Sequence, residues 1–460
     1  MIAIESMSSH SDRNHGRWDG FWRDYGMLLV LLCLCAFFSF ATFTEQQSTG
    51  AEAGRELAAR LLSQFGSRAR VLVAVPAEPG AVAMAEAFQS ALAPAGVTLV
   101  ANVKGEPKDA RAALQDAAAA GHLDALICTE ASAAWLVFAD LGADFPALGQ
   151  PRILQPRSHR WPSFLNRANL LNIANQIAVI ALVAIGMTMV IIAGGMDLSV
   201  GSLIALSAVL TGVLIRDGFG GTAAGAPGMI AASLLAILAC GLAGAINGGL
   251  ITAFGIPPFI VTLAMMLVAS GAAFLLSHGQ SVYQVPDAFV WLGRGADLLN
   301  LPNAVVLMGL LYLAAHIVMT RTVLGRHLYA VGGNRLAAQY AGVPIQRVLL
   351  AAYVASGLLA GLGGVVMASQ LKSGAPAYGG MYELYVIAAV VVGGASLNGG
   401  SGRMFGTLIG ALIIAVIQNG MNLMNVERYT QKVVLGLVIL GAVLLDHVRR
   451  RSAARVVAQS

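Results

Sequence analysis

The chain has 460 residues, of which 57% are hydrophobic and only 11% are charged, and its formal net charge at pH 7 is +5. Soluble domains carry roughly 25% charged residues, so this composition excludes an ordinary soluble enzyme. Apolar stretches recur along most of the chain, which also excludes a receptor with a single span. Of the four cysteines, three lie in apolar runs and one is isolated, so they form neither a disulfide framework nor a CxxC metal site.

The first apolar run, 27–43, follows a tail at 1–26 that contains Arg13, Arg17 and Arg23. No small-residue cleavage site closes this run, so we interpret it as a retained membrane span and not as a signal peptide. The basic tail predicts a cytoplasmic N-terminus.

Residues 45–168 differ from the rest of the chain in charge density. They contain 23 charged residues in 124 positions, whereas residues 169–447 contain 17 in 279 positions. The first density is that of a soluble domain, and the second is compatible only with lipid. We therefore expect a soluble insert after the first span, a membrane domain over 169–447 and a C-terminal tail over 448–460.

Three short apolar runs in the insert, 70–75, 97–103 and 123–129, are predicted to be buried strands. Ala-rich segments of helical length separate them at 78–95 and 107–121, and another helix is expected at about 51–65. This alternation predicts a small α/β fold with a parallel sheet and right-handed crossovers.

The membrane part is predicted to be all-α, with about ten transmembrane helices. The run 384–397 is short and ends in glycine, which is typical of a half-span. The expected spans lie near 27–43, 170–193, 198–215, 229–253, 258–277, 303–320, 346–368, 384–397, 404–424 and 433–446.

The positions of Lys and Arg test this arrangement, because short cytoplasmic loops are enriched in both residues. With ten crossings, twelve basic residues fall on one side and five fall in short loops on the other, the long insert being left out of the count. We assign the richer side to the cytoplasm of a bacterial inner membrane, which places both termini inside and the insert in the periplasm. The five outside residues are Arg216, Arg294, Lys372, Arg428 and Lys432.

Two interruptions of the membrane domain, 194–202 and 393–401, share the pattern GGxxLxxGS, and each follows an apolar run. Internal duplication around a central site is common in transporters. Glycine-rich turns also resemble one another by composition alone, so the sequence leaves both interpretations open.

The chain contains no GxxxxGK[ST], HExxH or GxSxG motif. We expect no catalytic residue, no metal site, no cofactor and no nucleic-acid partner; any ATP hydrolysis belongs to another subunit. The membrane domain offers only Asp197 and Glu383 as plausible buried acids. This scarcity disfavours a carrier coupled to a proton or sodium gradient.

The candidate pathway residues are few. Asp197 and Ser199 lie in a glycine-rich interruption, where Asp197 either caps the next half-helix or belongs to a gate. Glu383 lies at the start of a short span. Three neutral polar residues inside spans either face a pathway for a polyhydroxylated solute or bond a neighbouring helix; they are Asn247, Gln418 and Asn419.

Close helix packing is predicted from three GxxxG pairs, which begin at Gly244, Gly357 and Gly406. Small residues one turn apart on one helix face allow two backbones to approach. These pairs indicate packing and say nothing about what the protein carries.

The largest cytoplasmic loop, 321–347, is basic at both ends and contains a helix candidate over Asn334–Tyr340, framed by Gly332, Gly333 and Gly342. A short, exposed helix of this kind suits docking to a soluble partner. The alternative is a plain interfacial linker.

From 169 to 446 the sequence resembles the ribose-type permease subunits of bacterial ATP-binding-cassette sugar importers, within the larger branched-chain amino acid and sugar permease group. The resemblance rests on NLLNIANQ (169–176), AIGMTMVIIAGGMDLSVGSL (184–203), GIPPFIVTLAMM (255–266), LGRHLYAVGGN with AGV (324–343) and VVVGGASLNGGSGRMFGTLIGALI (391–413).

The resemblance implies a coupling segment at 324–343 that docks on an ATPase subunit. It also implies two permease copies, homo- or heterodimeric, two ATPase copies and a periplasmic sugar-binding protein. The family commonly has an acidic residue after GGN, where this chain has Arg335, so the detailed docking chemistry is expected to differ. The residues carried over to the coupling segment are Gly325, Arg326, Gly332, Gly333, Asn334, Arg335, Ala337 and Gly342.

The insert is larger than the brief outside loop of ordinary members, and it resembles half of the first lobe of periplasmic sugar-binding proteins. It is either a receptor-like lobe that docks a binding protein or completes a substrate site, or a spacer without a ligand.

We therefore expect a non-enzymatic permease subunit, surrounded by membrane lipid, that imports a monosaccharide or polyol. The alternative is a ligand sensor that uses the insert. A secondary carrier ranks third, because buried charges are scarce.

Overall fold

The computed structural model describes residues 26–47, 50–441 and 444. This part of the chain divides into two units, which we call the α/β unit (43–163) and the membrane unit (the helices on either side of it). The α/β unit ends before the predicted boundary at 168, since a membrane helix already begins at Arg167. The predicted tails at 1–26 and 448–460, apart from Gly26, lie outside the described residues.

The membrane unit consists mainly of apolar helices. Within the described residues, seven are long and apolar enough to cross a membrane, and two further apolar helices, Gly26–Ala41 and α16 (Tyr382–Val392), are shorter. Residues 428–441 are also helical, and the predicted span 433–446 extends beyond them into undescribed positions. The seven are α7 (Arg167–Ile192), α8 (Val200–Val213, continued by a π-helical turn to Gly218), α9 (Ala226–Phe254), α10 (Pro258–Ser277), α12 (Asn303–Arg321), α15 (Ile345–Leu371) and α17 (Met404–Leu423).

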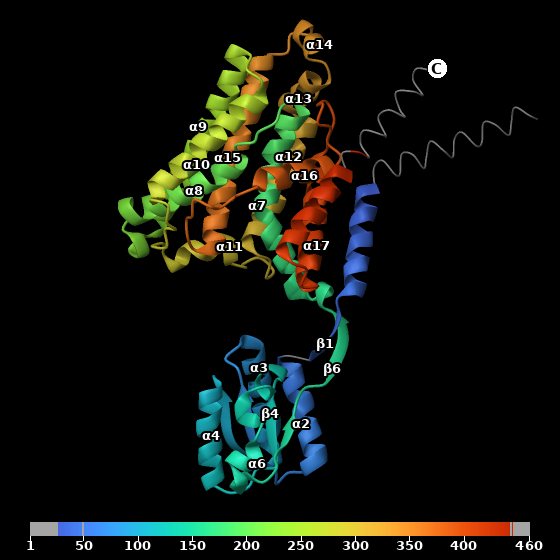
Figure 1. The fold of residues 1–460 in the computed structure, drawn as a ribbon, viewed down its shortest axis with the longest axis vertical. Coiled ribbons are helices and arrows are strands. Elements are labelled where there is room, and N and C mark those ends of the chain that lie inside the picture. The colour runs from blue at the N-terminus through green and yellow to red at the C-terminus, as the bar shows by residue number, and fades with distance from the viewer. Residues whose placement is uncertain (1–25, 48–49, 442–443, 445–460) are drawn as a thin grey trace, which may run out of the picture. The chain divides into compact units, whose positions relative to one another are not determined.

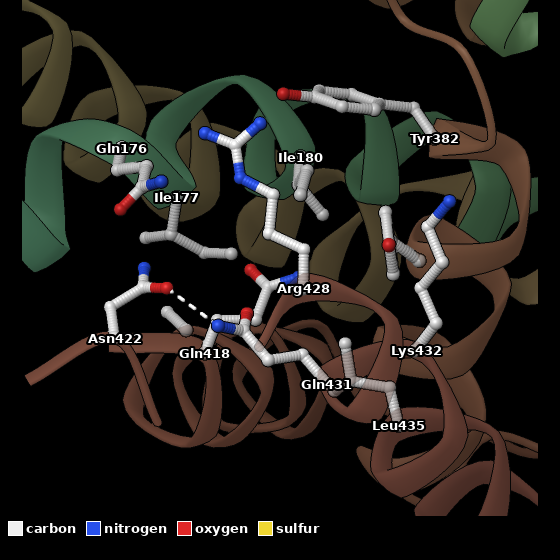
Figure 2. Close-up of a pocket in the computed structure, with 12 residues that line it drawn as sticks. Gln176, Ile177, Ile180, Tyr382, Gln418, Asn422, Arg428, Gln431, Lys432 and Leu435 are labelled. Atoms are coloured by element: carbon white, nitrogen blue, oxygen red, sulfur yellow. Dashed lines mark hydrogen bonds between the residues drawn. The ribbon is translucent and has the colours of Figure 1, made fainter. Parts of the chain in front are cut away.

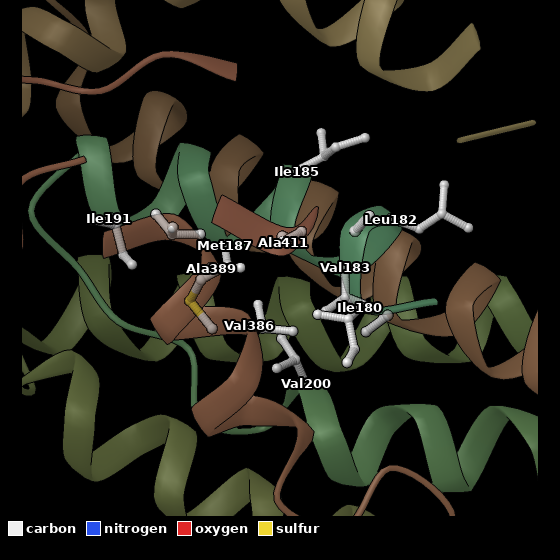
Figure 3. Packing of buried hydrophobic residues seen from close by; sticks show 14 of the residues in the cluster. Ile180, Leu182, Val183, Ile185, Met187, Ile191, Val200, Val386, Ala389 and Ala411 are labelled. Carbon is white, nitrogen blue, oxygen red and sulfur yellow. The ribbon is translucent and has the colours of Figure 1, made fainter. Parts of the chain in front are cut away.

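Helix α7 forms the centre of the membrane unit, where it packs against α12, α15, α16 and α17 (Figure 1). Of its most apolar stretch, 89% is buried, against 22–28% for α9, α10 and α12. Its aliphatic side chains pack among those of neighbouring helices, such as Val200 and Val386 (Figure 3). The outer helices expose apolar side chains, among them Leu242 and Leu267, which suits contact with lipid.

Glycines allow α9 and α15 to approach closely. A Cβ on Gly244 would overlap the carbonyl oxygen of Tyr353, and a Cβ on Gly357 would overlap that of Cys240. The GxxxG pairs therefore mark a true contact between helices, as the sequence predicted.

The helix Gly26–Ala41 docks on α17 beside the two chain crossings into the α/β unit. The ring of Phe38 stacks on Phe164, with 6.1 Å between ring centroids, and fills the space over Gly420 of α17. The Phe164 N–H donates to Thr42 Oγ1 at 3.1 Å. The chain thus leaves the membrane unit at Thr42 and re-enters it at Phe164 through neighbouring points.

The α/β unit is built on a four-stranded sheet of order β3-β2-β4-β5, in which all three pairings are parallel. Along β2, alternate side chains face opposite sides: Val71 and Val73 pack against α2 and α3, whereas Leu72 packs on the side of α4. The elements are α2 (Ala51–Phe65), β2 (Arg70–Val75), α3 (Pro79–Leu92), β3 (Thr98–Lys104), α4 (Pro107–Ala119), β4 (Ala125–Cys128) and β5 (Arg152–Leu154).

Three strands of the α/β unit were not predicted. β5 has only three residues, and β1 (Phe43–Gln47) pairs antiparallel with β6 (Ser158–Pro162) in a two-stranded ribbon. The ribbon strands read FTEQQ and SHRWP, which lack an apolar alternation. Their pairing depends on residues far apart in the chain, and local patterning carries no signal for it.

Candidate functional site

Two short helices, α13 (Val323–Gly333) and α14 (Arg335–Tyr340), form the predicted coupling segment at one end of the membrane unit (Figure 1). Asn334 separates them, and its side chain accepts the Ala337 N–H at 3.0 Å, which begins α14. Gly342 follows the end of α14 and adopts the left-handed conformation, with φ 78°. Sequence reasoning placed this helix within one residue of where it lies.

The outer surface of this segment is exposed. Arg326, Gly333, Asn334, Arg335, Ala337 and Gly342 are all exposed, whereas Gly325 is buried against the backbone of Met319. Sequence reasoning missed two further residues: Leu336 is 67% exposed and Tyr340 is 90% exposed. They lie four residues apart and therefore share one face of α14. Their signal was a pair of large side chains, leucine and tyrosine, four residues apart in a short helix.

The inner side of α13 touches both glycine-rich interruptions of the membrane unit. A Cβ on Gly332 would overlap the carbonyl oxygen of Ile192, the last residue of α7. The N–H of Gly400 donates to the same carbonyl oxygen at 2.8 Å. Tyr329 Oη donates to the carbonyl oxygen of Gly402 at 2.8 Å. We call this contact among α13, residues 192–194 and residues 399–402 the glycine junction.

The two GGxxLxxGS segments end their preceding helices in the same way. Gly194 and Gly394 have φ angles of 83° and 89°, in the left-handed region. Their N–H groups donate to Ile191 and Val391, three residues back in each case. The equivalent geometry accords with an internal duplication, and the two turns meet where Gly399 approaches Gly194.

Asp197 lies between the first of these turns and α8, and it is completely buried. Its carboxylate accepts hydrogen bonds from Ser199 Oγ at 2.5 Å, the Ser199 N–H at 3.1 Å and Ser356 Oγ of α15 at 2.7 Å. Asn247 of α9 donates to Ser199 Oγ at 3.2 Å. This buried network ties the interruption to α9 and α15.

Asp197 Oδ1 accepts the backbone N–H of Ser199, two residues on, which is the contact that a capping side chain makes with the turn leading into α8. The second carboxylate oxygen is held across the helix interface by Ser356. Ser199 precedes the first residue of α8, and its own side chain makes no capping hydrogen bond. Asn247 likewise bonds within the network and does not line a cavity described below.

Glu383 lies in the first turn of α16 and is half-buried. Its carboxylate packs against Gly201 of α8, where a Cβ would overlap Glu383 Oε2. Its neighbours Tyr382 and Tyr385 line the polar cavity described next, whereas Glu383 is not among the lining residues.

A polar cavity lies at the other end of the membrane unit, around the first turns of α7. One part has a volume of about 340 Å³ and an adjoining part about 500 Å³; both are lined by Gln176 and Asn422. We call the two parts together the amide cavity. Figure 2 shows the smaller part, whose other polar lining residues are Tyr382, Tyr385, Gln418, Arg428, Gln431 and Lys432. The larger part adds Asn169, Asn172, Asn175, Gln370 and Asn419.

Asn419 bonds a neighbouring helix and also lines the cavity. Its amide and that of Asn169 exchange hydrogen bonds at 2.9 and 3.0 Å, which joins α17 to α7. The same pair lines the larger part of the cavity. Gln418 lines the smaller part.

Most cavity residues were missed by sequence reasoning, although a signal was present. Asn169, Asn172 and Gln176 recur at helical spacing in α7, and Gln418 and Asn422 do so in α17. An amide stripe on an otherwise apolar helix predicts a shared polar surface. Between Gln176 and Ile192, α7 rises about 24 Å, so the cavity and the glycine junction lie near opposite ends of one rigid helix.

Comparison with known proteins gives a consistent result. The family model described as "Branched-chain amino acid transport system / permease component" matches residues 169–443, which begin after the α/β unit. The ribose import permease protein RbsC of Escherichia coli K12 is 42% identical over 294 residues, covering 62% of this chain and 88% of that protein.

Two further relatives agree. RbsC of Bacillus subtilis 168 is 43% identical over 294 residues, covering 64% of this chain and 88% of that protein. The D-allose transport system permease protein AlsC of E. coli K12 is 38% identical over 283 residues, covering 62% of this chain and 84% of that protein. No solved structure matches the chain.

Proposed function

We propose, since this chain belongs to the family of branched-chain amino acid transport system permease components, that it is the membrane subunit of an ATP-driven importer for a monosaccharide or a related polyol. The sugar permeases among its relatives support the substrate class. The observation that carries the proposal in this chain is the amide cavity. Amide groups both donate and accept hydrogen bonds, which suits a solute with many hydroxyl groups.

The chain is a transport subunit and not an enzyme, so ATP is hydrolysed by a partner subunit. In our proposal α14 docks on that ATPase through Leu336 and Tyr340, with Arg335 at the rim. An exposed aromatic residue beside an aliphatic one is typical of an interface core. Movement of α13 then reaches the membrane helices through the glycine junction.

We propose an inner-membrane protein with ten crossings and both termini in the cytoplasm. Support comes from the twelve basic residues on one side against five on the other, and from the apolar helices described above. In this orientation the coupling segment is cytoplasmic and the amide cavity opens toward the periplasm. Two copies of the chain, or this chain and a related one, would enclose the pathway.

The α/β unit would then be periplasmic. Its parallel sheet resembles half of a sugar-binding lobe, and we propose that it docks the substrate-binding protein or contributes to a substrate site. A single lobe is too small to enclose a ligand alone, which favours the docking role.

The test is ATP-dependent uptake into proteoliposomes that contain this chain, its ATPase and its binding protein, screened over pentoses, hexoses and polyols. We expect accumulation of at least one sugar that stops when the ATPase is omitted. Uptake that persists without the ATPase would overturn the assignment. A chain that binds sugar through its α/β unit but never transports it would be a sensor.

A further inference from the structure

Two basic side chains, Arg428 and Lys432, extend into the smaller part of the amide cavity (Figure 2). They lie four residues apart on the helix 428–441, so both project from the same face. The remaining lining residues are neutral: none is Asp or Glu. This part of the cavity therefore carries positive charge without an acidic residue in its wall.

Within the residues that the structure describes, neither cation is paired with a carboxylate, since none lies within 4 Å of either group. The other three basic residues of the outside loops are all engaged. They are Arg216, paired with Asp217; Lys372, paired with Asp287; and Arg294, which donates to the carbonyl oxygen of Gln370.

Two like charges one helical turn apart repel each other and weaken the helix that carries them. Both side chains are exposed, and neutral residues would line the wall without this repulsion. An anion between the two groups removes the repulsion and makes charge-assisted hydrogen bonds, which are the stronger kind. The arrangement thus favours a ligand that brings its own negative charge.

The side-chain amides that line this part can donate and accept hydrogen bonds, as hydroxyl groups require. Gln431 is already engaged, because its Nε2 donates to Asn422 Oδ1 and to the carbonyl oxygen of Val426, both at 2.8 Å. The side-chain amides of Gln176 and Gln418 make no hydrogen bond within the described residues. They remain available, beside the two cations, to bind a solute.

We propose that the transported solute is a sugar acid, a polyhydroxylated molecule with one carboxylate such as an aldonate or uronate. Arg428 and Lys432 hold the carboxylate, and Gln176 and Gln418 bind hydroxyl groups. The Arg428 guanidinium can hold both carboxylate oxygens at once. The proposal rests on the proposed function and narrows it from neutral monosaccharides to their acids.

The experiment measures uptake by the complete importer in proteoliposomes for matched pairs of solutes: gluconate with glucose, and xylonate with xylose. We expect the acid of a pair to be accumulated well above its neutral parent. In Arg428→Gln/Lys432→Gln, uptake of the acid falls roughly tenfold or more, as loss of charge-assisted contacts predicts. Arg216→Gln, which removes an outside cation away from the cavity, leaves uptake of the acid within about twofold.

A second measurement separates this chain from the selectivity of its binding protein. Gluconate, and not glucose, should raise the unfolding temperature of the purified full-length chain, and the double substitution should abolish the shift. A wild-type importer that accumulates neutral sugars and excludes their acids overturns the inference while leaving the proposed function intact. If the substitutions act only in vesicles containing phosphatidylglycerol, and equally on both members of a pair, the cations bind lipid and the inference is wrong. Absence of ATP-dependent uptake of every solute contradicts the proposed function itself.

Discussion

The backbone N–H of Gly400 donates a 2.8 Å hydrogen bond to the carbonyl oxygen of Ile192. This bond joins the loop after α16 to the end of α7, the most deeply buried long helix. Gly332 of α13 packs against the same carbonyl oxygen. Three segments that are far apart in sequence therefore meet at one atom, and α13 cannot shift without disturbing the other two.

The glycine junction makes Gly332→Ala a test of coupling. The added Cβ would overlap the backbone of Ile192 and Gly400, so α13 has to move away. We expect uptake to fall roughly tenfold or more while the partner ATPase still hydrolyses ATP, because the contact that we propose to carry the movement is lost. Uptake and ATP hydrolysis are measured in the same vesicles.

The matched control is Gly333→Ala, where the added Cβ meets no atom within 4 Å. It changes the same residue type one position along the same helix. Equal loss of uptake in both variants would show that helix properties, and not the junction, are responsible.

The exposed face of α14 predicts how the ATPase is held. Leu336→Ser/Tyr340→Ser removes both large exposed side chains and is expected to weaken association with the ATPase by roughly tenfold or more, as loss of an interface core does. Gln339→Ser, at an exposed position on the same helix, serves as control. The measurement is the affinity of the purified chain for the ATPase; unchanged affinity in the double variant would place the docking surface elsewhere.

The buried network around Asp197 predicts a cost for Ser356→Ala. The substitution removes a 2.7 Å hydrogen bond to a fully buried carboxylate, and we expect a loss of about 1–3 kcal/mol in the free energy of unfolding. Thermal or denaturant unfolding in detergent measures it.

Ser233→Ala is the appropriate comparison for that change. The Ser233 hydroxyl donates only to the carbonyl oxygen of Met229 in its own helix. Removing it should therefore change the free energy of unfolding by no more than about 0.5 kcal/mol. If both substitutions lowered the free energy of unfolding by the same amount, the hydrogen bond from Ser356 to Asp197 would not stabilise the protein more than a hydrogen bond within one helix does.

The junction at Thr42 and Phe164 predicts that the α/β unit can be removed. These residues are hydrogen-bonded, so a short Gly/Ser linker can replace residues 43–163 without straining the membrane unit. We expect the shortened chain to keep its helical content and its unfolding temperature, because the Phe38–Phe164 stack is retained.

The same variant tests the role of the α/β unit. If the unit docks the binding protein, the shortened chain shows lower affinity for that protein, together with uptake that saturates at a higher concentration of it. Unchanged affinity and uptake would identify the unit as a spacer.

Much of the architecture follows from local sequence. Long apolar runs specify membrane helices because the bilayer allows no unpaired backbone group, and this is why α9, α10 and α15 fall where hydropathy places them. The strand β2 at 70–75 and the helix α2 at 51–65 were likewise placed correctly. The spacing of apolar residues along a strand or helix shows which of its faces is buried, and this spacing can be read directly from the sequence.

Tertiary structure alone decided which polar residues work together. Asp197 and Ser356 are 159 positions apart, and Asn169 and Asn419 are 250 apart. Local patterning left a cap or a gate open for Asp197, and a pathway or a helix contact open for Asn419. Distances between side chains on different helices settle such questions, since hydrogen bonds and charges act over only a few ångströms.

The sequence by itself thus indicated a polytopic membrane protein whose helices are interrupted by a segment of higher charge density, and its motifs indicated a sugar permease. Only the packed structure showed that Asp197 and Asn247 belong to a buried network, and that Gln176, Arg428 and Lys432 line one cavity. Hydropathy is a property of a continuous stretch of sequence, so it can be evaluated without knowing the fold. The cavity, by contrast, is formed by side chains from different segments, and it exists only when α7, α16, α17 and the helix that follows have packed together.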